Sequence, residues 1–175
     1  MKRTLFYALA LSLFFVYLPG AKAEKKALSP VGYWKNIDDK TGKPKAIIHI
    51  YESGGKLYGE IVKLIRKKGE EQCPKCTKCR GWRKNKPTCG MLILWNLKNK
   101  GDYWGDGKIL DPANGKDYRC WIQVQENGKK LKVRGYIGFS LLGRTQYWYR
   151  VPKPTEGTCK QVCGKKKGEK EGKKK

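Results

Sequence analysis

Short stretches in which apolar and polar residues alternate recur along most of the chain, with turn residues between them. In the stretch 117–125, Tyr118, Cys120, Ile122 and Val124 occupy every second position and the residues between them face the other way. A period of two is typical of a β-strand that buries one face. Together with the apolar runs, this pattern predicts eight strands, at residues 31–37, 45–52, 57–65, 91–97, 104–110, 117–125, 131–135 and 144–151.

Turn residues join most of the predicted strands. Ser53-Gly54-Gly55 and Glu126-Asn127-Gly128 supply residues that tolerate positive φ, and 111–115 combines a proline with Asn-Gly. Short strands joined by hairpins, without a convincing long helix, predict an all-β fold: a single antiparallel up-and-down β-barrel of about eight strands. Closure removes exposed sheet edges, and a barrel of this size either fills with side chains or holds one small ligand.

The aromatic segment 134–151 is expected to close the barrel. Its alternation puts Gln146, Trp148 and Arg150 on one face and Tyr147 and Tyr149 on the other. We expect Trp148 and Arg150 to fold back onto the first strand. The same parity predicts a set of inward side chains, namely Trp34, Ile48, Ile50, Tyr118, Cys120, Ile122, Leu131, Val133, Trp148 and Arg150.

These inward positions support two interpretations. An apolar interior with a few polar tips is what a small-ligand cavity requires, and the same side chains could equally fill a narrow barrel. If a ligand site exists, its candidate residues are Trp34, Ile48, Ile50, Tyr118, Ile122 and Trp148. The expected partner is then a small apolar or amphipathic molecule.

The two ends of the chain differ from its middle. Lys2 and Arg3, the apolar run 5–18 and a small-x-small site at 21–23 predict a secretory signal peptide over residues 1–23, with an uncleaved anchor as the alternative. The product is then exported, either periplasmic or secreted. A basic lead at 24–30, a barrel domain at 31–152 with a cysteine-bearing loop at 66–90, and a disordered Lys/Gly-rich tail at 153–175 would follow.

The chain is strongly basic, with a formal net charge of +25. Without Lys2, Arg3 and Lys22, 37 basic and 15 acidic residues remain, a net of +22. Such a charge attracts polyanions, so electrostatic contact with nucleic acid, anionic lipid headgroups or envelope polymers is an alternative function. The alternative to polyanion binding is a solvated lysine surface without a partner. It is favoured because Lys outnumbers Arg and no nucleic-acid motif is present.

Seven cysteines raise the question of disulfides against metal or redox chemistry. The disulfide candidates are Cys73, Cys76, Cys79, Cys89, Cys159 and Cys163. Export favours disulfides, such as a Cys73–Cys89 bridge or a local Cys159–Cys163 pair, although spacing alone does not give the connectivity. The first four could instead hold zinc as thiolates, and Cys76–Cys79 could be redox-active. Cys120 is the expected buried free thiol.

No catalytic set stands out, so we expect a protein that is not an enzyme and needs no cofactor. His49 is the single histidine, and its place in an alternating stretch predicts a surface strand position. Asp102, Asp106, Asp111 and Asp117 are spaced like turn residues and lack the pattern of a calcium loop.

Four blocks of sequence, at 32–52, 76–95, 105–121 and 134–150, resemble the exported bacterial family called "domain of unknown function 2147". The resemblance covers 31–151 and implies a lipocalin-like barrel in a small envelope protein, with no established activity. Cys76, Cys79 and Cys120 match the cysteines of the family pattern, and the other four look like additions.

A shorter likeness concerns the first strand. Gly32-Tyr33-Trp34 is similar to the Gly-x-Trp of lipocalins, in which an arginine of the last strand packs over the tryptophan. This resemblance implies that Gly32, Trp34 and Arg150 close one end of the barrel.

Overall fold

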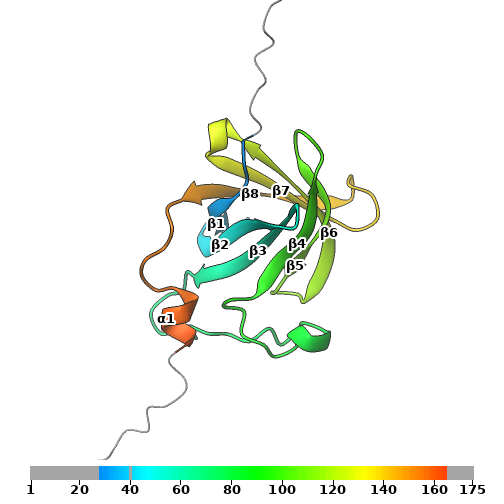
Figure 1. Cartoon of the computed structure of the whole chain (residues 1–175). Helices are drawn as coiled ribbons and strands as arrows, with labels where there is room; N and C mark the ends of the chain where they lie inside the picture. The colour runs from blue at the N-terminus through cyan, green and yellow to red at the C-terminus, as the bar shows by residue number, and fades with distance from the viewer. Residues whose placement is uncertain (1–27, 40, 165–175) are drawn as a thin grey trace, which may run out of the picture.

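The computed structural model describes residues 28–39 and 41–164, which form a closed barrel of eight antiparallel strands (Figure 1). Each strand pairs with the next along the chain, and the last strand pairs with the first. The strands are β1 (Gly32–Ile37), β2 (Pro44–Ser53), β3 (Lys56–Leu64), β4 (Leu92–Asn99), β5 (Trp104–Asp111), β6 (Lys116–Gln125), β7 (Lys130–Tyr136) and β8 (Gly143–Val151). The predicted fold class is confirmed.

The pattern of alternation sets the register of the strands. Between β6 and β7, Cys120 lies opposite Gly135 and Ile122 opposite Val133, so the apolar residues of both strands share the inner face. A bulge interrupts the pairing of β5 with β6 between Trp104 and Gly107. At Gly107, a Cβ would lie 2.5 Å from the Leu97 side chain, so only glycine lets β4 and β5 approach this closely.

Side chains fill the middle of the barrel. Trp34, Ile50, Leu57 and Ile122 have no solvent-accessible surface. A void large enough for a water molecule would leave accessible surface on the atoms that line it, so no such void touches these four residues. In the middle of the barrel, the structure therefore favours the interpretation in which the inward side chains fill the interior over the one in which they line a ligand cavity.

One end of the barrel is closed by the two terminal strands. The guanidinium of Arg150 on β8 lies over the indole ring of Trp34 on β1, 4.2 Å from the ring centroid. It also donates hydrogen bonds to the backbone carbonyls of Ser29, Val31 and Gly128. These contacts join the segment before β1, the β6–β7 connection (η2, Glu126–Gly128) and the last strand.

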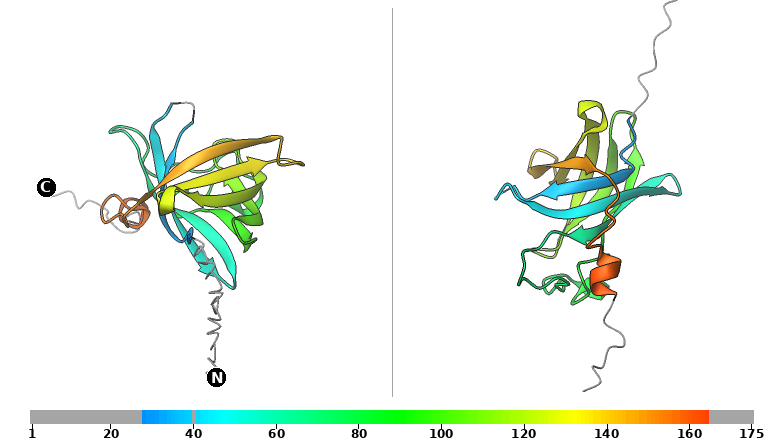
Figure 2. Two further views of the ribbon diagram at one scale, coloured as in Figure 1. Left: turned by 90° about the horizontal axis from the view of Figure 1, so that it is seen from above. Right: turned by 90° about the vertical axis from the view of Figure 1, so that its left-hand side faces the viewer.

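The segment after β8 is ordered as far as it is described, which corrects the expectation of disorder from residue 153. It runs along the outside of the barrel to a short helix, α1 (Cys159–Cys163), which packs beside β3 (Figure 2). Disulfides Cys73–Cys163 and Cys89–Cys159 tie this helix to the β3–β4 loop. The predicted signal peptide 1–23 and the end of the tail, 165–175, lie outside the described residues.

The cysteine pairing differs from the bridges considered from the sequence. Neither Cys73–Cys89 nor Cys159–Cys163 forms, because the tail returns to the β3–β4 loop, where Cys73 pairs with Cys163 and Cys89 with Cys159. Cys76 pairs with Cys79, and Cys120 is the buried free thiol. The zinc alternative at Cys73, Cys76, Cys79 and Cys89 is also wrong, since disulfide sulfurs are not available as thiolate ligands.

The β3–β4 loop packs against the end of the β5–β6 hairpin. The Cys76 sulfur lies 3.4 Å from the carbonyl oxygen of Pro112, and a Cβ at Gly115 would collide with the carbonyl of Lys78. Arg83, in the 3-10 turn η1 (Gly81–Arg83), donates two hydrogen bonds to Asp117 at 2.8 and 3.1 Å. Within 28–39 and 41–164, no helix has the length and apolar character needed to cross a bilayer.

Candidate functional site at the barrel mouth

The inward face of β8 changes in character along its length. Arg144, Gln146, Trp148 and Arg150 occupy alternate positions and so point to the same side of the sheet. Arg150 belongs to the closed end, and Arg144 lies at the opposite end, where β1 finishes and β8 begins. We call this end the mouth. The row therefore passes from an exposed cation through an amide to a buried indole.

Gln146 links this row to the first strand. Its side-chain carbonyl accepts a hydrogen bond from the Asn36 amide at 3.1 Å and one from the Trp148 indole N–H at 3.2 Å. Asn36 is 9% exposed and Trp148 is 1% exposed, so both donors would be costly to leave without a partner. Gln146 thus satisfies two buried groups at the boundary between the polar mouth and the apolar interior.

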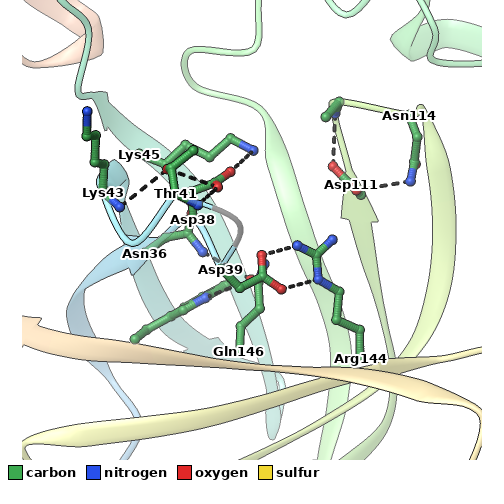
Figure 3. Close-up of polar contacts among 12 residues, drawn as sticks. Asn36, Asp38, Asp39, Thr41, Lys43, Lys45, Asp111, Asn114, Arg144 and Gln146 are labelled. Atoms are coloured by element: carbon green, nitrogen blue, oxygen red, sulfur yellow. Dashed lines mark hydrogen bonds and ion pairs between the residues drawn. The ribbon is translucent and has the colours of Figure 1, made fainter.

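The cation at the mouth is paired. Arg144 forms a two-pronged ion pair with Asp39 in the β1–β2 loop, and the amide of Gln146 lies 3.5 Å from the same carboxylate (Figure 3). Hydrogen bonds from Arg144 hold the pKa of Asp39 below its ordinary value, and Asp39 in turn raises the pKa of Arg144. Both side chains keep substantial solvent exposure, 51% for Arg144 and 31% for Asp39, so solute molecules can reach the pair.

A second polar wall faces Arg144 across the mouth in Figure 3. The Asn114 amide donates to the Asp111 carboxylate at 3.0 Å and to the Tyr118 hydroxyl at 2.9 Å. The charge of Asp111 also raises the pKa of Arg144. This wall is built by the β5–β6 turn, in which Asp111 and Asn114 additionally accept backbone N–H groups.

Between the two walls, β7 contributes a residue without a side chain. Gly135 lies opposite Arg144, and a Cβ at this position would meet Ile109 at 3.4 Å and Tyr118 at 3.6 Å. Ile109 and Tyr118 are half-buried, unlike the residues deeper in the barrel. The mouth thus combines one cation, the carboxylates of Asp39 and Asp111, three side-chain amides and a partly accessible apolar floor.

The residues predicted to line a ligand site fall into two groups. Trp34, Ile48, Ile50, Ile122 and Trp148 are 0–1% exposed and belong to the filled interior. Tyr118 is half-buried and belongs to the mouth.

Sequence reasoning overlooked two residues of the mouth. Asn36 follows Trp34 by two positions, and Arg144 precedes Gln146 by two. The same alternation that placed Trp34 and Gln146 inward, extended by one step along each strand, would have found both.

The other candidate chemistry lies away from the mouth. His49 stacks on Tyr33 at 4.5 Å on the outer face, with Glu60 at 3.9 Å, as a surface strand position requires. Cys76 and Cys79 are 1% and 3% exposed, so their disulfide is poorly accessible for redox exchange. In the part of the chain that the structure describes, no group of His, Cys, Asp or Glu could hold a metal ion.

The described surface also has hollows outside the barrel. One, of about 210 Å³, lies between the end of β3 and α1 and is lined by residues that include Lys63 and Arg66. Another, of about 370 Å³, lies on the outer face of β5, β6 and β7 and includes Tyr103, Trp121 and Tyr136.

Comparison with known proteins gives one structural relative. A search of curated proteins gives no significant match. The fold is similar to that of protein HP1028 from the human pathogen Helicobacter pylori, described as belonging to the lipocalin family, with a TM-score of 0.63. The alignment covers 72% of this chain and 85% of that chain at 19% sequence identity, which shows the fold alone. The chain itself belongs to the family described as "Uncharacterized protein conserved in bacteria (DUF2147)", whose model matches residues 32–150.

Proposed function

We propose that this protein is an exported, non-enzymatic barrel that binds a small amphipathic anion, such as a short-chain carboxylate, at its mouth. The observation that carries the proposal is the row Arg144, Gln146 and Trp148, which leads along one strand from solvent to the apolar interior. A cation, an amide and an indole in this order match a molecule with a charged head and an apolar body.

The ligand's charged group is assigned to Arg144. A guanidinium binds a carboxylate through two parallel hydrogen bonds, and Asp39 already occupies Arg144 in this way. A ligand carboxylate would take the place of Asp39, whose loop lies at the rim and whose side chain is partly exposed. The apolar part of the ligand would then rest on Ile109 and Tyr118, beside the space left by Gly135.

The packed interior limits the size of this ligand. Ile50, Ile122 and Trp148 leave no room for an apolar chain in the middle of the barrel. A short molecule held at Arg144 would leave these residues in place, whereas a long one must displace them, at the cost of opening a well-packed core. We therefore expect the affinity for a carboxylate to rise with the length of its hydrocarbon chain only while that chain stays between the mouth and Trp148.

Export is part of the proposal and is supported by two observations. The first residues have the basic, apolar and small-residue order of a signal peptide, and they lie outside the described residues. The described chain carries three disulfides, which form and persist in oxidising compartments.

Native mass spectrometry and NMR test the binding function together. The first should detect an organic anion on protein purified from the periplasm. In the second, straight-chain carboxylates from butanoate to dodecanoate are titrated while the indole N–H signals of Trp148 and Trp82 are followed. Short carboxylates should shift the Trp148 signal and leave that of Trp82, which lies 71% exposed in η1, unchanged. No bound species and no Trp148 shift with any carboxylate would overturn the proposal.

A further inference from the structure

The connection between β7 and β8 exposes an unusual group of apolar side chains. Ile137 is 63% exposed, Phe139 79%, Leu141 91% and Leu142 74%. The loop projects from the barrel beside β6 in Figure 1, where it is drawn in gold. Four large apolar side chains in six residues, all in solvent, weaken solubility and contribute nothing to the core, so an external partner is the physical reason to keep them.

The loop is held in shape by polar contacts. Arg134 on β7 donates hydrogen bonds to the carbonyls of Ser140 and Leu141 at 2.7 and 3.1 Å, and to the Thr145 hydroxyl at 2.8 Å. The indole N–H of Trp121 on β6 donates to the Ser140 hydroxyl at 3.1 Å. Because these hydrogen bonds hold the loop backbone against β6 and β7, the apolar side chains already point into solvent in the free protein. Less conformational entropy is then lost on binding.

Basic and aromatic side chains surround the base of the loop. The Lys132 ammonium lies 5.3 Å from the Trp121 ring centroid, and the Arg119 guanidinium lies 5.9 Å from that of Tyr136. From Trp104 to Val151 the chain has nine Lys and Arg against four Asp and Glu, a net of +5. One of the acids, Asp106, lines the hollow beside the loop, where its carboxylate pairs with Lys100 at 2.6 Å.

That hollow joins the loop to the barrel wall. It has a volume of about 370 Å³ and is lined by Tyr103, Trp121 and Tyr136 as well as by Ser140 of the loop itself. Tyrosine and tryptophan combine an apolar ring with a polar tip, which suits them to the boundary between hydrocarbon and water. From the loop toward the barrel, the surface therefore changes from exposed apolar side chains to aromatic rings with cations beside them.

We propose that the loop 137–142 docks the protein on the surface of an anionic phospholipid bilayer, with Phe139 and Leu141 inserted among the lipid chains and Arg119 and Lys132 beside the headgroup phosphates. The charge of the chain complements an anionic surface, and a projecting tip suits a surface that can be penetrated better than it suits the rigid face of a folded partner. The proposal does not depend on ligand binding at the mouth.

Vesicle flotation of the purified, oxidised protein tests this proposal. The vesicles contain phosphatidylcholine either alone or with phosphatidylglycerol, and four proteins are compared: wild type, Phe139→Ser/Leu141→Ser, Arg119→Gln/Lys132→Gln and Trp82→Ser. The last variant removes Trp82, an exposed aromatic outside the loop. All the replaced side chains except Arg119 and Lys132 are exposed apolar groups, and thermal unfolding of each variant confirms that it is folded.

Wild type should bind vesicles with phosphatidylglycerol at least about tenfold more tightly than phosphatidylcholine alone. The loop variant should lose binding by about tenfold or more on both, and the Arg119/Lys132 variant should lose only the preference for the anionic lipid. Trp82→Ser should bind as wild type does. If the loop variant binds like wild type, lysine charge alone drives binding and the proposal is wrong. It is also wrong if the wild type forms a dimer that the loop variant does not, because the surface is then an interface between two copies.

Discussion

The guanidinium of Arg150 stacks on the indole ring of Trp34 at 4.2 Å, and so brings together the last strand of the chain and the first. The Trp34 indole N–H is itself bonded to the carbonyl of Pro30 at 2.8 Å. Gly32 makes room for this arrangement, since a Cβ there would lie 2.7 Å from a guanidinium nitrogen of Arg150. The closed end of the barrel is thus one connected cluster of ring, cation and backbone carbonyls.

Replacing Arg150 tests the contribution of that cluster to stability. Arg150→Lys keeps the charge but cannot reach three carbonyls in a planar fork, so we expect a loss of about 2–4 kcal/mol in the free energy of unfolding. Urea denaturation measures it. Arg119→Lys, on the outer face, serves as the control and should change stability by no more than about 0.5 kcal/mol. Equal losses of unfolding free energy for the two substitutions would show that the stacked cluster contributes no more to stability than an arginine on the outer face.

Trp148 should be the most costly aromatic of the last strand to truncate. It is 1% exposed and fills the barrel below Gln146, so Trp148→Ala should lower the free energy of unfolding by about 3–5 kcal/mol. Tyr149, its neighbour on the outer face, is 42% exposed, and Tyr149→Ala should cost at most about 1 kcal/mol. A thermal midpoint of Trp148→Ala within a degree of wild type would refute the packed interior.

The alternation of residues predicted the fold because burial of one strand face acts at every second position. It placed all eight strands and the inward side chains Ile48, Ile122 and Trp148. The alternation could not place Tyr118 at the mouth, because it indicates which face of the sheet a residue occupies and not its depth along the barrel. The alternation also covers Arg144, two positions before Gln146, but its pairing with Asp39 could not be predicted, because Asp39 lies in a loop and loop geometry has no periodic signal.

The pairing of the disulfides could not be predicted from the sequence for a different reason. Cys159 and Cys163 look like a local pair in a polar tail, and composition predicted that this tail would be disordered. Their partners lie 70 and 90 residues away, and the path of the tail along the barrel depends on tertiary contacts such as that between Lys63 and the carbonyl of Glu156.

The pairing of the tail with the β3–β4 loop can be tested by counting thiols. In Cys89→Ser/Cys159→Ser, the Cys73–Cys163 and Cys76–Cys79 bridges remain, so the denatured protein should show one free thiol, that of Cys120. Three free thiols would instead indicate the Cys73–Cys89 and Cys159–Cys163 pairing. With Cys73–Cys163 intact, the missing bridge would have closed a ring of about 20 residues, so its loss should cost about 3 kcal/mol of stability.

Cys120 should be inert in the folded protein. Burial raises the pKa of its thiol well above the ordinary value, so it stays protonated at a pH at which an exposed cysteine forms the reactive thiolate. In the unfolded chain the thiol ionises near pH 8.5, so its contribution to stability is fully present below about this pH and is lost as the pH rises further.

A thiol reagent at pH 8 should therefore label Cys120 only after denaturation. The stability lost between pH 8 and pH 10 should be smaller in Cys120→Ala than in wild type, because the variant has no thiol to ionise. Rapid labelling of the native protein, or an identical pH dependence of the two proteins, would contradict the burial of this thiol.

Calorimetric titration with hexanoate, compared among wild type, Asp39→Asn and Arg144→Gln, tests the central claim most directly. If the ligand carboxylate replaces Asp39 at Arg144, then Asp39→Asn removes a competitor and should bind hexanoate about tenfold more tightly. Arg144→Gln should bind at least about tenfold more weakly, while Arg83→Gln, which breaks a comparable pair with Asp117 outside the barrel, should match wild type. Equal affinities in all four proteins, or no binding in any of them, would contradict an anion site at the mouth.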